Sequence, residues 1–438
     1  MIQQSVASEK WSPIKRLGSL LSIYFLFLIF DFTSSDELYP HFVYQLMQFY
    51  TNFWDWIVPW TGKHILHLSY PITVKPNGSG DTTYNYVLQL LWIFFTVILA
   101  VAILFIDRKR ESYAKWDYWL RIVVRYFFAY MLFVYGFVKV IKLQFPFPDL
   151  NRLTETYGES SPMGLAWAFV GYSPGYNYFT GGAEVLAGML LFFKRTTLLG
   201  TVLAMTIMGN VVAMNMAYDI PVKIFSMNML LTAIWIAWYD KDRLISVFIT
   251  HRAIPEKPEP AIFHTRWKKI LQLSLKTLVI FFAFYATFWT CLSNAAKYGD
   301  GVPKPPLYGI YDVVTFIRDG KTVLPLTTDS SRWKRVIINY DGVIRVNNML
   351  GIANWMRFEL DTIKANAKFS SFDDSTQFYH MHYRVIESNN PKSKVKGLAF
   401  QGKIGKDSIQ VTMKGFDINK LLLVNRGFHW INEESFNR

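Results

Sequence analysis

Hydrophobic blocks separated by short polar stretches dominate the first two thirds of the chain. Between residues 118 and 240 four blocks follow one another, and three are long enough to cross the ~30 Å core of a bilayer as helices. The second block reaches that length if its helix begins near Tyr176. Two further blocks precede them, at 17–32 and 84–106, and one follows, at 270–292. The pattern predicts a membrane bundle of about seven helices.

After a Pro-rich linker at 301–306 the pattern changes to an alternation of apolar and polar residues. The alternating segments are separated by Gly, Asp, Asn or Ser, which is typical of strands joined by turns. They cover 308–317, 333–340, 343–347, 354–361, 367–372, 377–386, 397–404, 407–416 and 420–431. Eight or nine short strands predict an up-and-down barrel, with a sandwich as the second choice.

Charge orients the predicted bundle. The chain has 438 residues and a net charge of +14, and its basic residues crowd the loops at 108–115, 194–195 and 239–269. In a seven-helix count these loops all lie on one side, which the positive-inside rule makes the cytoplasm. We therefore predict a multi-pass protein of a bacterial cytoplasmic membrane, with a cytoplasmic N-terminus and a periplasmic C-terminal domain. No nucleic-acid recognition motif accompanies the charge, so nucleic acid is not an expected partner.

Composition narrows the chemistry. The chain has a single cysteine, Cys291, so it has no internal disulfide, no CxxC redox pair and no Cys/His zinc cluster. His64 and His67 are three residues apart, which could place both on one helical face. Two histidines are only half of a metal ligand set, so no metal site is predicted. Redox chemistry would need a bound cofactor or a partner protein. An aromatic stretch at 39–60 is predicted as an interfacial helix, with tryptophans suited to the headgroup level.

Polar residues inside the apolar blocks are the strongest functional signal, because a charge in a bilayer is costly and usually faces a bundle interior. The predicted catalytic residues are Glu184, Lys139 and Lys223, and the predicted binding residues are Asn210, Asn215, Asn228, Tyr135 and Arg125. We expect an outward-opening pocket in which Glu184 pairs with one of the two lysines. A quinone head group suits it, because its carbonyls accept hydrogen bonds and a carboxylate can exchange protons. The alternatives are ion pairs and amides that only hold helices together, and lysines that reach the membrane surface.

Residues 121–240 resemble the DoxX family. The likeness rests on the motifs YGFVKV, GGAEVLAGMLLFFKR, TTLLGTVLAM and WIAWYD, in that order. The resemblance implies a four-helix membrane module, named for its similarity to a subunit of a thiosulfate:quinone oxidoreductase, with Lys139 and Glu184 as the residues carried over. Three additional helices, a long outer loop and a β domain are not part of the usual module.

The β domain resembles the lipocalin and calycin barrels. Gly309, Ile310 and Tyr311 stand where that family has a Gly-x-Trp on its first strand, with Tyr in place of Trp. By the same likeness Arg426 would be the arginine that packs over the aromatic ring. This family implies a cup for an apolar ligand, although small barrels are often filled by their own side chains.

The sequence thus predicts four regions. Residues 1–117 hold two membrane helices and an outer aromatic loop, 118–243 the DoxX-like module, 244–294 a cytoplasmic link and the seventh helix, and 301–438 the barrel. The expected function is a subunit or accessory of a quinone-linked redox process, with membrane lipids, a quinone or other apolar ligand and a redox protein as partners. The alternatives are a non-enzymatic lipid-binding or transfer protein and a membrane assembly factor.

Overall fold

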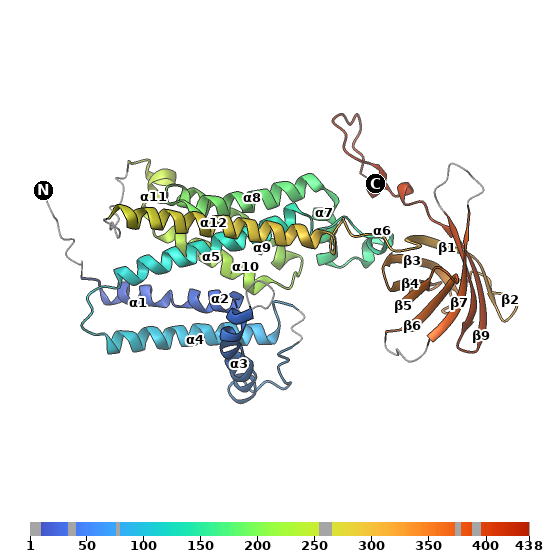
Figure 1. Cartoon of the computed structure of the whole chain (residues 1–438), viewed down its shortest axis with the longest axis horizontal. Coiled ribbons are helices and arrows are strands. Elements are labelled where there is room, and N and C mark those ends of the chain that lie inside the picture. The colour runs from blue at the N-terminus through green and yellow to red at the C-terminus, as the bar shows by residue number, and fades with distance from the viewer. Residues whose placement is uncertain are drawn as a thin grey trace. The chain divides into compact units, whose positions relative to one another are not determined.

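The structure is a computed structural model that describes residues 10–33, 41–75, 79–253, 265–372, 378–387 and 396–437. The central part of the predicted cytoplasmic link, 254–264, lies outside them. The chain divides into two compact units, each made of two stretches (Figure 1). The helical unit comprises 1–141 and 175–293, and the barrel unit comprises 142–174 and 294–438.

The helical unit follows the predicted apolar blocks. Its elements are α1 (Pro13–Leu21), α2 (Tyr24–Thr33), α3 (His41–His64), α4 (Thr83–Ile106), α5 (Ala114–Val140), α8 (Pro174–Phe192), η2 (Lys194–Thr196), α9 (Thr197–Ala217), α10 (Lys223–Trp238), α11 (Lys241–Ile245), η3 (Ser246–Thr250) and α12 (Arg266–Ala295). Among the described residues, five segments are long and apolar enough to cross a membrane: Pro13–Phe32, Thr83–Ile106, Ala114–Val140, Lys194–Ala217 and Arg266–Ala295.

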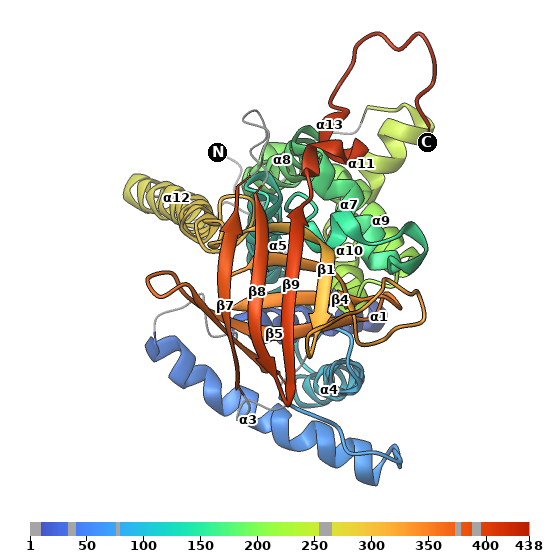
Figure 2. The ribbon, with the colours of Figure 1, turned by 90° about the vertical axis from the view of Figure 1, so that its right-hand side faces the viewer.

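The two remaining blocks of the predicted seven also form helices, but they are shorter or more polar. α10 has 16 residues, and α8 has 19 residues that include Asn177 and Glu184. The aromatic stretch forms α3, which runs crosswise to α4 (Figures 1 and 2). A helix that crosses its neighbours in this way is suited to the interfacial position predicted for it.

The C-terminal domain is a closed antiparallel barrel, as the alternation predicts. Its strands are β1 (Gly309–Arg318), β2 (Lys321–Thr322), β3 (Trp333–Tyr340), β4 (Val343–Asn348), β5 (Ala353–Asp361), β6 (Asn366–Ser371), β7 (Phe378–Ile386), β8 (Gly397–Ile404) and β9 (Asp407–Gly415). From β3 to β9 each strand pairs with the next, and β9 returns to pair with β1 (Figure 2). β1 and β3–β9 close the barrel, and the two-residue β2 pairs with the end of β1.

Side chains fill the barrel interior. Phe369 of β6 lies 5.3 Å from the ring of Phe358 on β5 and 5.4 Å from the ring of Phe400 on β8, measured between ring centroids. All three belong to a continuous core that also includes Phe316 and Trp333. Contacts between rings of non-adjacent strands mean that aromatic side chains occupy the middle of the barrel.

The Gly-x-aromatic motif of β1 has a steric reason. A Cβ on Gly309 would lie 3.3 Å from both Cζ and the hydroxyl oxygen of Tyr311, a tight contact that glycine avoids. Tyr311 is buried and donates a hydrogen bond of 2.9 Å to the carbonyl of Leu307. Burial raises its pKa to about 12, so the hydroxyl stays protonated and keeps donating.

Two predictions for the end of the chain are wrong. The stretch 420–431 is not a ninth barrel strand: it follows η4 (Ile418–Lys420) and contains the short helix α13 (Leu422–Asn425). The β1–β9 pairing leaves no strand edge for it to join. Arg426 bonds to His429 and Asn432 and lies over the ring of Phe436, all in the same C-terminal segment, instead of packing over Tyr311.

Residues 142–174, which we call the connector, lead from α5 to α8 and belong to the barrel unit. The connector contains α6 (Leu150–Thr154), η1 (Tyr157–Glu159) and α7 (Pro162–Tyr172). The side chain of Leu150, 1% exposed, packs against Ile310 and Ile337, which alternate with the inward-facing residues of β1 and β3. The connector is therefore attached to the outer surface of the barrel.

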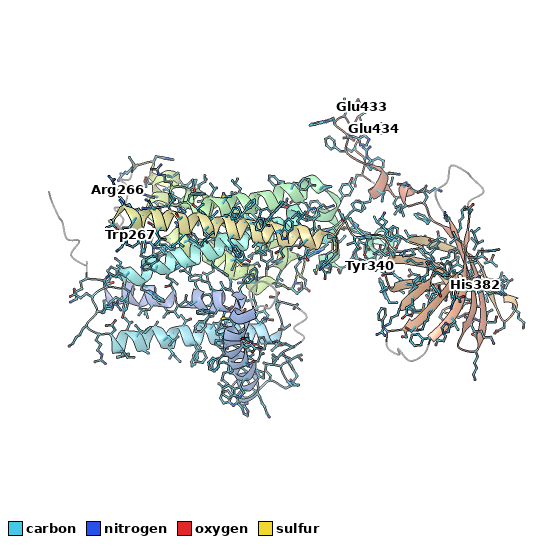
Figure 3. All side chains as sticks on the ribbon, in the orientation of Figure 1. Arg266, Trp267, Tyr340, His382, Glu433 and Glu434 are labelled. Carbon is cyan, nitrogen blue, oxygen red and sulfur yellow. The ribbon has the colours of Figure 1, made fainter. Side chains whose placement is uncertain are left out.

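Hydrogen bonds fix the connector on the barrel. The N–H of Leu150 donates to Asn339 Oδ1 at 3.2 Å, and the carboxylate of Asp149 accepts from Asn339 and from the hydroxyl of Tyr340, labelled in Figure 3. Nearer its start, Lys142 Nζ lies 2.5 Å from Asp300 Oδ2. The contacts of Asp149 and Leu150 hold the start of α6 against β3.

We predict that Leu150→Ala destabilises the barrel unit by about 3 kcal/mol, because a buried leucine is replaced by a cavity. Chemical unfolding of the purified protein in mild detergent, followed by hydrogen exchange of the β1 and β3 peptides, measures the change. Leu423→Ala, which removes the same atoms from an exposed position, is the matched control. Equal stability of the two variants would contradict the packing of Leu150 described above.

Candidate functional site

The helical unit contains a buried ion pair between Lys139 and Glu184. Lys139 Nζ lies 2.8 Å from Oε2 and 3.0 Å from Oε1 of Glu184, so the ammonium bonds to both carboxylate oxygens. The lysine side chain is 9% exposed and the glutamate side chain 2%. Lys139 is in the last turn of α5, and Glu184 is in the middle of α8. Of the two lysines predicted as partners of Glu184, the structure pairs it with Lys139.

Glycines allow α5 and α8 to approach closely enough for this pair. A Cβ on Gly181 of α8 would lie 2.6 Å from the carbonyl oxygen of Gly136 and 2.8 Å from Cβ of Lys139. A Cβ on Gly136 of α5 would in turn lie 2.9 Å from the carbonyl oxygen of Gly181. About two turns further along α8, a Cβ on Gly188 would lie 2.8 Å from the carbonyl oxygen of Ala129. Small residues of this kind let helix backbones touch.

Tyr135 lies beside the ion pair. Its carbonyl oxygen is 3.4 Å from Lys139 Nζ, and the centroid of its ring is 5.7 Å from the same nitrogen. The ring also contacts Phe225 of α10, with 5.4 Å between centroids. The ammonium thus has a carboxylate, a carbonyl and an aromatic face around it. Such a pair can donate hydrogen bonds through the lysine and exchange a proton through the glutamate.

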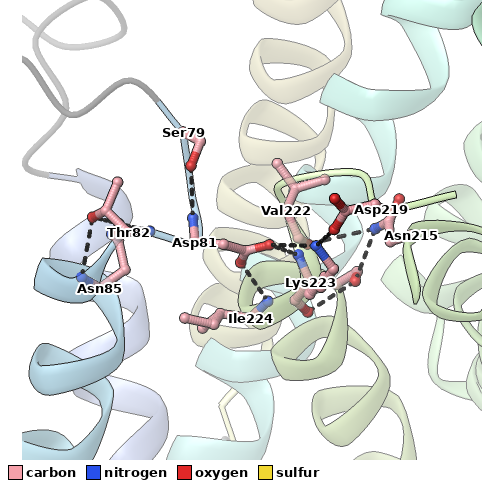
Figure 4. Close-up of polar contacts among 10 residues, drawn as sticks. Ser79, Asp81, Thr82, Asn85, Asn215, Asp219, Val222, Lys223 and Ile224 are labelled. Carbon is pink, nitrogen blue, oxygen red and sulfur yellow. Dashed lines mark hydrogen bonds and ion pairs between the residues drawn. The ribbon is translucent and has the colours of Figure 1, made fainter. Parts of the chain in front are cut away.

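Lys223 belongs to a different cluster, at the turn between α9 and α10 (Figure 4). Its Nζ lies 2.8 Å from Asp219 Oδ1 and 3.8 Å from Asp81 Oδ2. The hydrogen bond from Lys223 lowers the pKa of Asp219, which keeps this carboxyl charged. Lys223 is therefore neutralised by two aspartates, and the prediction that it belongs to a pocket with Glu184 has no support in these contacts.

Asp81 belongs to this cluster and was not predicted from the sequence. Its carboxylate accepts from the N–H groups of Lys223 at 2.8 Å and Ile224 at 3.0 Å, the first residues of α10. An acidic side chain at a helix N-terminus is favourable, but here it comes from the loop before α4. The sequence shows Asp81 in a run of N-capping residues, which points to α4 and gives no sign that it caps α10.

The predicted asparagines connect helices. Asn215 of α9 donates from Nδ2 to Ser226 Oγ of α10 at 3.0 Å. Asn228 of α10 accepts from the hydroxyl of Tyr24 on α2 at 2.5 Å and donates to Gln89 Oε1 on α4 at 3.1 Å. The amide of Gln89 donates to the hydroxyl of Tyr24, which closes a ring of three side chains. Sequence reasoning missed Tyr24 and Gln89, although each is a polar residue within an apolar block.

Two predicted residues lie elsewhere. Asn210 is exposed on α9, and Arg125 of α5 donates to Thr197 Oγ1 at 2.9 Å. The eight predicted site residues therefore do not form one hydrogen-bonded group. The predicted pocket rested on polar residues within apolar blocks, and this position does not determine which neighbour a polar side chain faces.

Comparison with known proteins identifies one relationship. No family model and no solved structure matches the chain. A segment of 126 residues is 35% identical to YwoB, an uncharacterized protein of Bacillus subtilis (strain 168), and covers 79% of that protein. The chain belongs to the YwoB family. The match covers 28% of the present chain, and because YwoB is itself uncharacterized the relationship carries no reaction.

Among the described residues, no three His, Cys, Asp or Glu side chains are grouped so that they could hold a metal ion. The Lys139–Glu184 pair is thus the arrangement in this YwoB-family chain with the clearest capacity for proton chemistry.

Adjacent glycines of α8 test the close approach of α5 and α8. Gly181→Ala should reduce the stability of the helical unit by about 1–3 kcal/mol, because the new methyl group meets the backbone of Gly136. Gly182→Ala is the matched control, since its Cβ would meet no atom within 4 Å, and alanine should favour the helix by up to about 1 kcal/mol. Folded yield and thermal unfolding in detergent measure the stability of both variants. A Gly181→Ala variant as stable as the wild type would contradict the close backbone contact between α5 and α8.

Proposed function

We propose that this chain is a multi-pass protein of the bacterial cytoplasmic membrane that serves a quinone-linked redox process as a subunit or accessory. The apolar character of α4, α5, α9, α12 and the α1–α2 segment supports the membrane location. The basic loops support an orientation with the barrel in the periplasm. The motifs in 118–243 support a DoxX-like four-helix core within the YwoB-family chain.

The Lys139–Glu184 pair carries this proposal. Ionisable groups within apolar helices are expensive to bury, and they usually mark a pathway or a reaction site. Reduction of a quinone to a quinol takes up two electrons and two protons. In the proposed site Lys139 donates a hydrogen bond to a quinone carbonyl, and the carboxylate of Glu184 accepts a proton from the hydroxyl of the quinol form when the quinol is oxidised.

The residues present fit a quinone in their chemistry. The ammonium of Lys139 has three N–H donors, and its partners are the two oxygens of Glu184 and the carbonyl of Tyr135. A substrate carbonyl can replace one of these acceptors without leaving the charge unpaired. The electrons would come from a redox partner protein, because Cys291 is the only cysteine of the chain.

The alternative in which the barrel carries a lipid is less well supported. The rings of Phe358, Phe369 and Phe400 contact one another in the barrel interior, where a ligand of a lipocalin-like cup would lie. The alternative in which the ion pair only holds the helices together is weakened by the cost of burying its charges. Burying an ion pair costs desolvation, and apolar residues of similar size often stabilise a fold equally well.

The test separates these roles with three variants. Glu184→Gln and Lys139→Met each leave one group of the pair behind, and the double variant removes both charges while keeping the side-chain volumes similar. We expect the double variant to fold in good yield and to lose bound quinone. Mass spectrometry of small molecules extracted after purification in mild detergent measures the quinone, and size-exclusion chromatography measures folded yield.

Asn210→Ala, at an exposed position of α9, is the control and should retain wild-type quinone content. Quinone at wild-type stoichiometry in the double variant would rule out a role of the pair in binding it. Loss of folded protein in the double variant would instead assign the pair to helix association. A phospholipid as the only extracted molecule, unchanged among the variants, would favour lipid transfer or assembly.

A further inference from the structure

The outer surface of the barrel has three cations stacked on three aromatic rings. The guanidinium of Arg345 lies 5.5 Å from the ring centroid of Trp355, and that of Arg357 lies 5.6 Å from Phe372. Lys368 Nζ lies 3.6 Å from the ring centroid of Phe378. We call these six residues the cation–aromatic face.

Strand register places the face on one continuous patch across β4–β7. Arg345 is paired with Trp355, and the β5–β6 ladder ends at Met356 and Ser371, next to Trp355 and Phe372. Ser370 is the link between the remaining rows, because it is paired with Arg357 on β5 and with Phe378 on β7. The inward positions of the same strands belong to the core, so these side chains point outward.

The face is cationic and exposed. Trp355, Phe372 and Phe378 are each more than two fifths exposed, although rings of this size are normally covered. Glu359 lies 3.4 Å from Lys368 and offsets part of its charge. On the neighbouring strand β7, His380 is paired with Lys368, while Arg384 and His382 are exposed; His382 is labelled in Figure 3. The surface is thus suited to an anionic partner.

Apolar tips next to the face decide between kinds of anion. The loop between β4 and β5 exposes Leu350 and Ile352, by 48% and 54%. This loop joins β4 to β5 at the end of the barrel where β6 reaches Phe372 and β7 begins at Phe378. A free phosphate or a nucleic-acid backbone gains no binding energy from exposed aliphatic side chains. A lipid surface does, because apolar residues enter the acyl boundary while aromatic rings and cations remain at the headgroups.

We propose that the cation–aromatic face binds the phosphate headgroups of an anionic lipid surface, with Leu350 and Ile352 inserted between the lipids. Arg345, Arg357 and Lys368 contact the phosphates. The aromatic rings hold these cations in place and lie at the level of the headgroups. This role is separate from the redox proposal, because none of its residues belongs to the helical unit.

A vesicle-binding experiment tests the proposal with the full-length chain. The protein is embedded in phosphatidylcholine nanodiscs and floated with vesicles of phosphatidylcholine alone or of phosphatidylcholine with phosphatidylglycerol. We expect binding to the anionic vesicles only. Combined Arg345→Gln, Arg357→Gln and Lys368→Gln should weaken it roughly a hundredfold, because each basic residue near such a surface contributes about fivefold.

Two further variants complete the design. The matched control removes three exposed lysines from β8, β9 and the turn between them, as Lys403→Gln, Lys406→Gln and Lys414→Gln, and should bind almost as the wild type does. Leu350→Ser with Ile352→Ser should weaken binding while leaving its dependence on salt. Circular dichroism confirms that the barrel of each variant is folded.

Equal losses in the two triple variants would overturn the proposal, since net charge and not the face would then bind the vesicles. Full displacement by glycerol phosphate, together with wild-type binding by the Leu350 and Ile352 variant, would show a phosphate site instead of a lipid surface. Tighter binding to a single-stranded oligonucleotide than to the vesicles would also overturn it. None of these results depends on whether Lys139 and Glu184 bind a quinone.

Discussion

A charge buried among apolar helices must meet its opposite within hydrogen-bonding distance, and the arrangement of α5 and α8 follows from that requirement. The ammonium of Lys139 and the carboxylate of Glu184 are 2.8 Å apart, and neither side chain is exposed by more than a tenth. Beside this pair the two helix backbones are in close contact, which the glycines at 136 and 181 permit. Desolvating the two charges costs several kcal/mol per ion, so stability alone gives weak grounds for keeping them. That imbalance is why the pair is a better candidate for chemistry than for packing.

The connector adds a consequence that follows from chain connectivity. The two helices that contribute the ion pair are joined by residues 142–174, and these residues contact the barrel strands through Asp149 and Leu150. The carboxyl end of α5 and the amino end of α8 therefore continue directly into residues whose positions depend on the barrel fold.

The sequence predicted features whose cause is local and missed those whose cause is distant. Alternation along each strand is local, and eight of the predicted strands are present in the barrel. The stretch 420–431 has the same alternation, but closure of β1 on β9 had already used the available edges. The pairing of Glu184 with a lysine could be predicted from the sequence because charged residues in apolar blocks are rare. The capping of α10 by Asp81 was not, since a carboxylate in a turn gives no sign of the helix whose N–H groups it will meet.

The remaining polar residues show why polar side chains within apolar helices need not form one site. Tyr24, Gln89 and Asn228 bond to one another in a ring, so their donors and acceptors are satisfied without a ligand. This ring joins the two N-terminal helical segments to α10, and as a neutral network it has no proton to give at ordinary pH. Asn215 and Ser226 join α9 to α10 in the same manner. Helix association thus accounts for the amides, whereas the ion pair between α5 and α8 combines a carboxylate that can accept a proton with an ammonium group that donates hydrogen bonds.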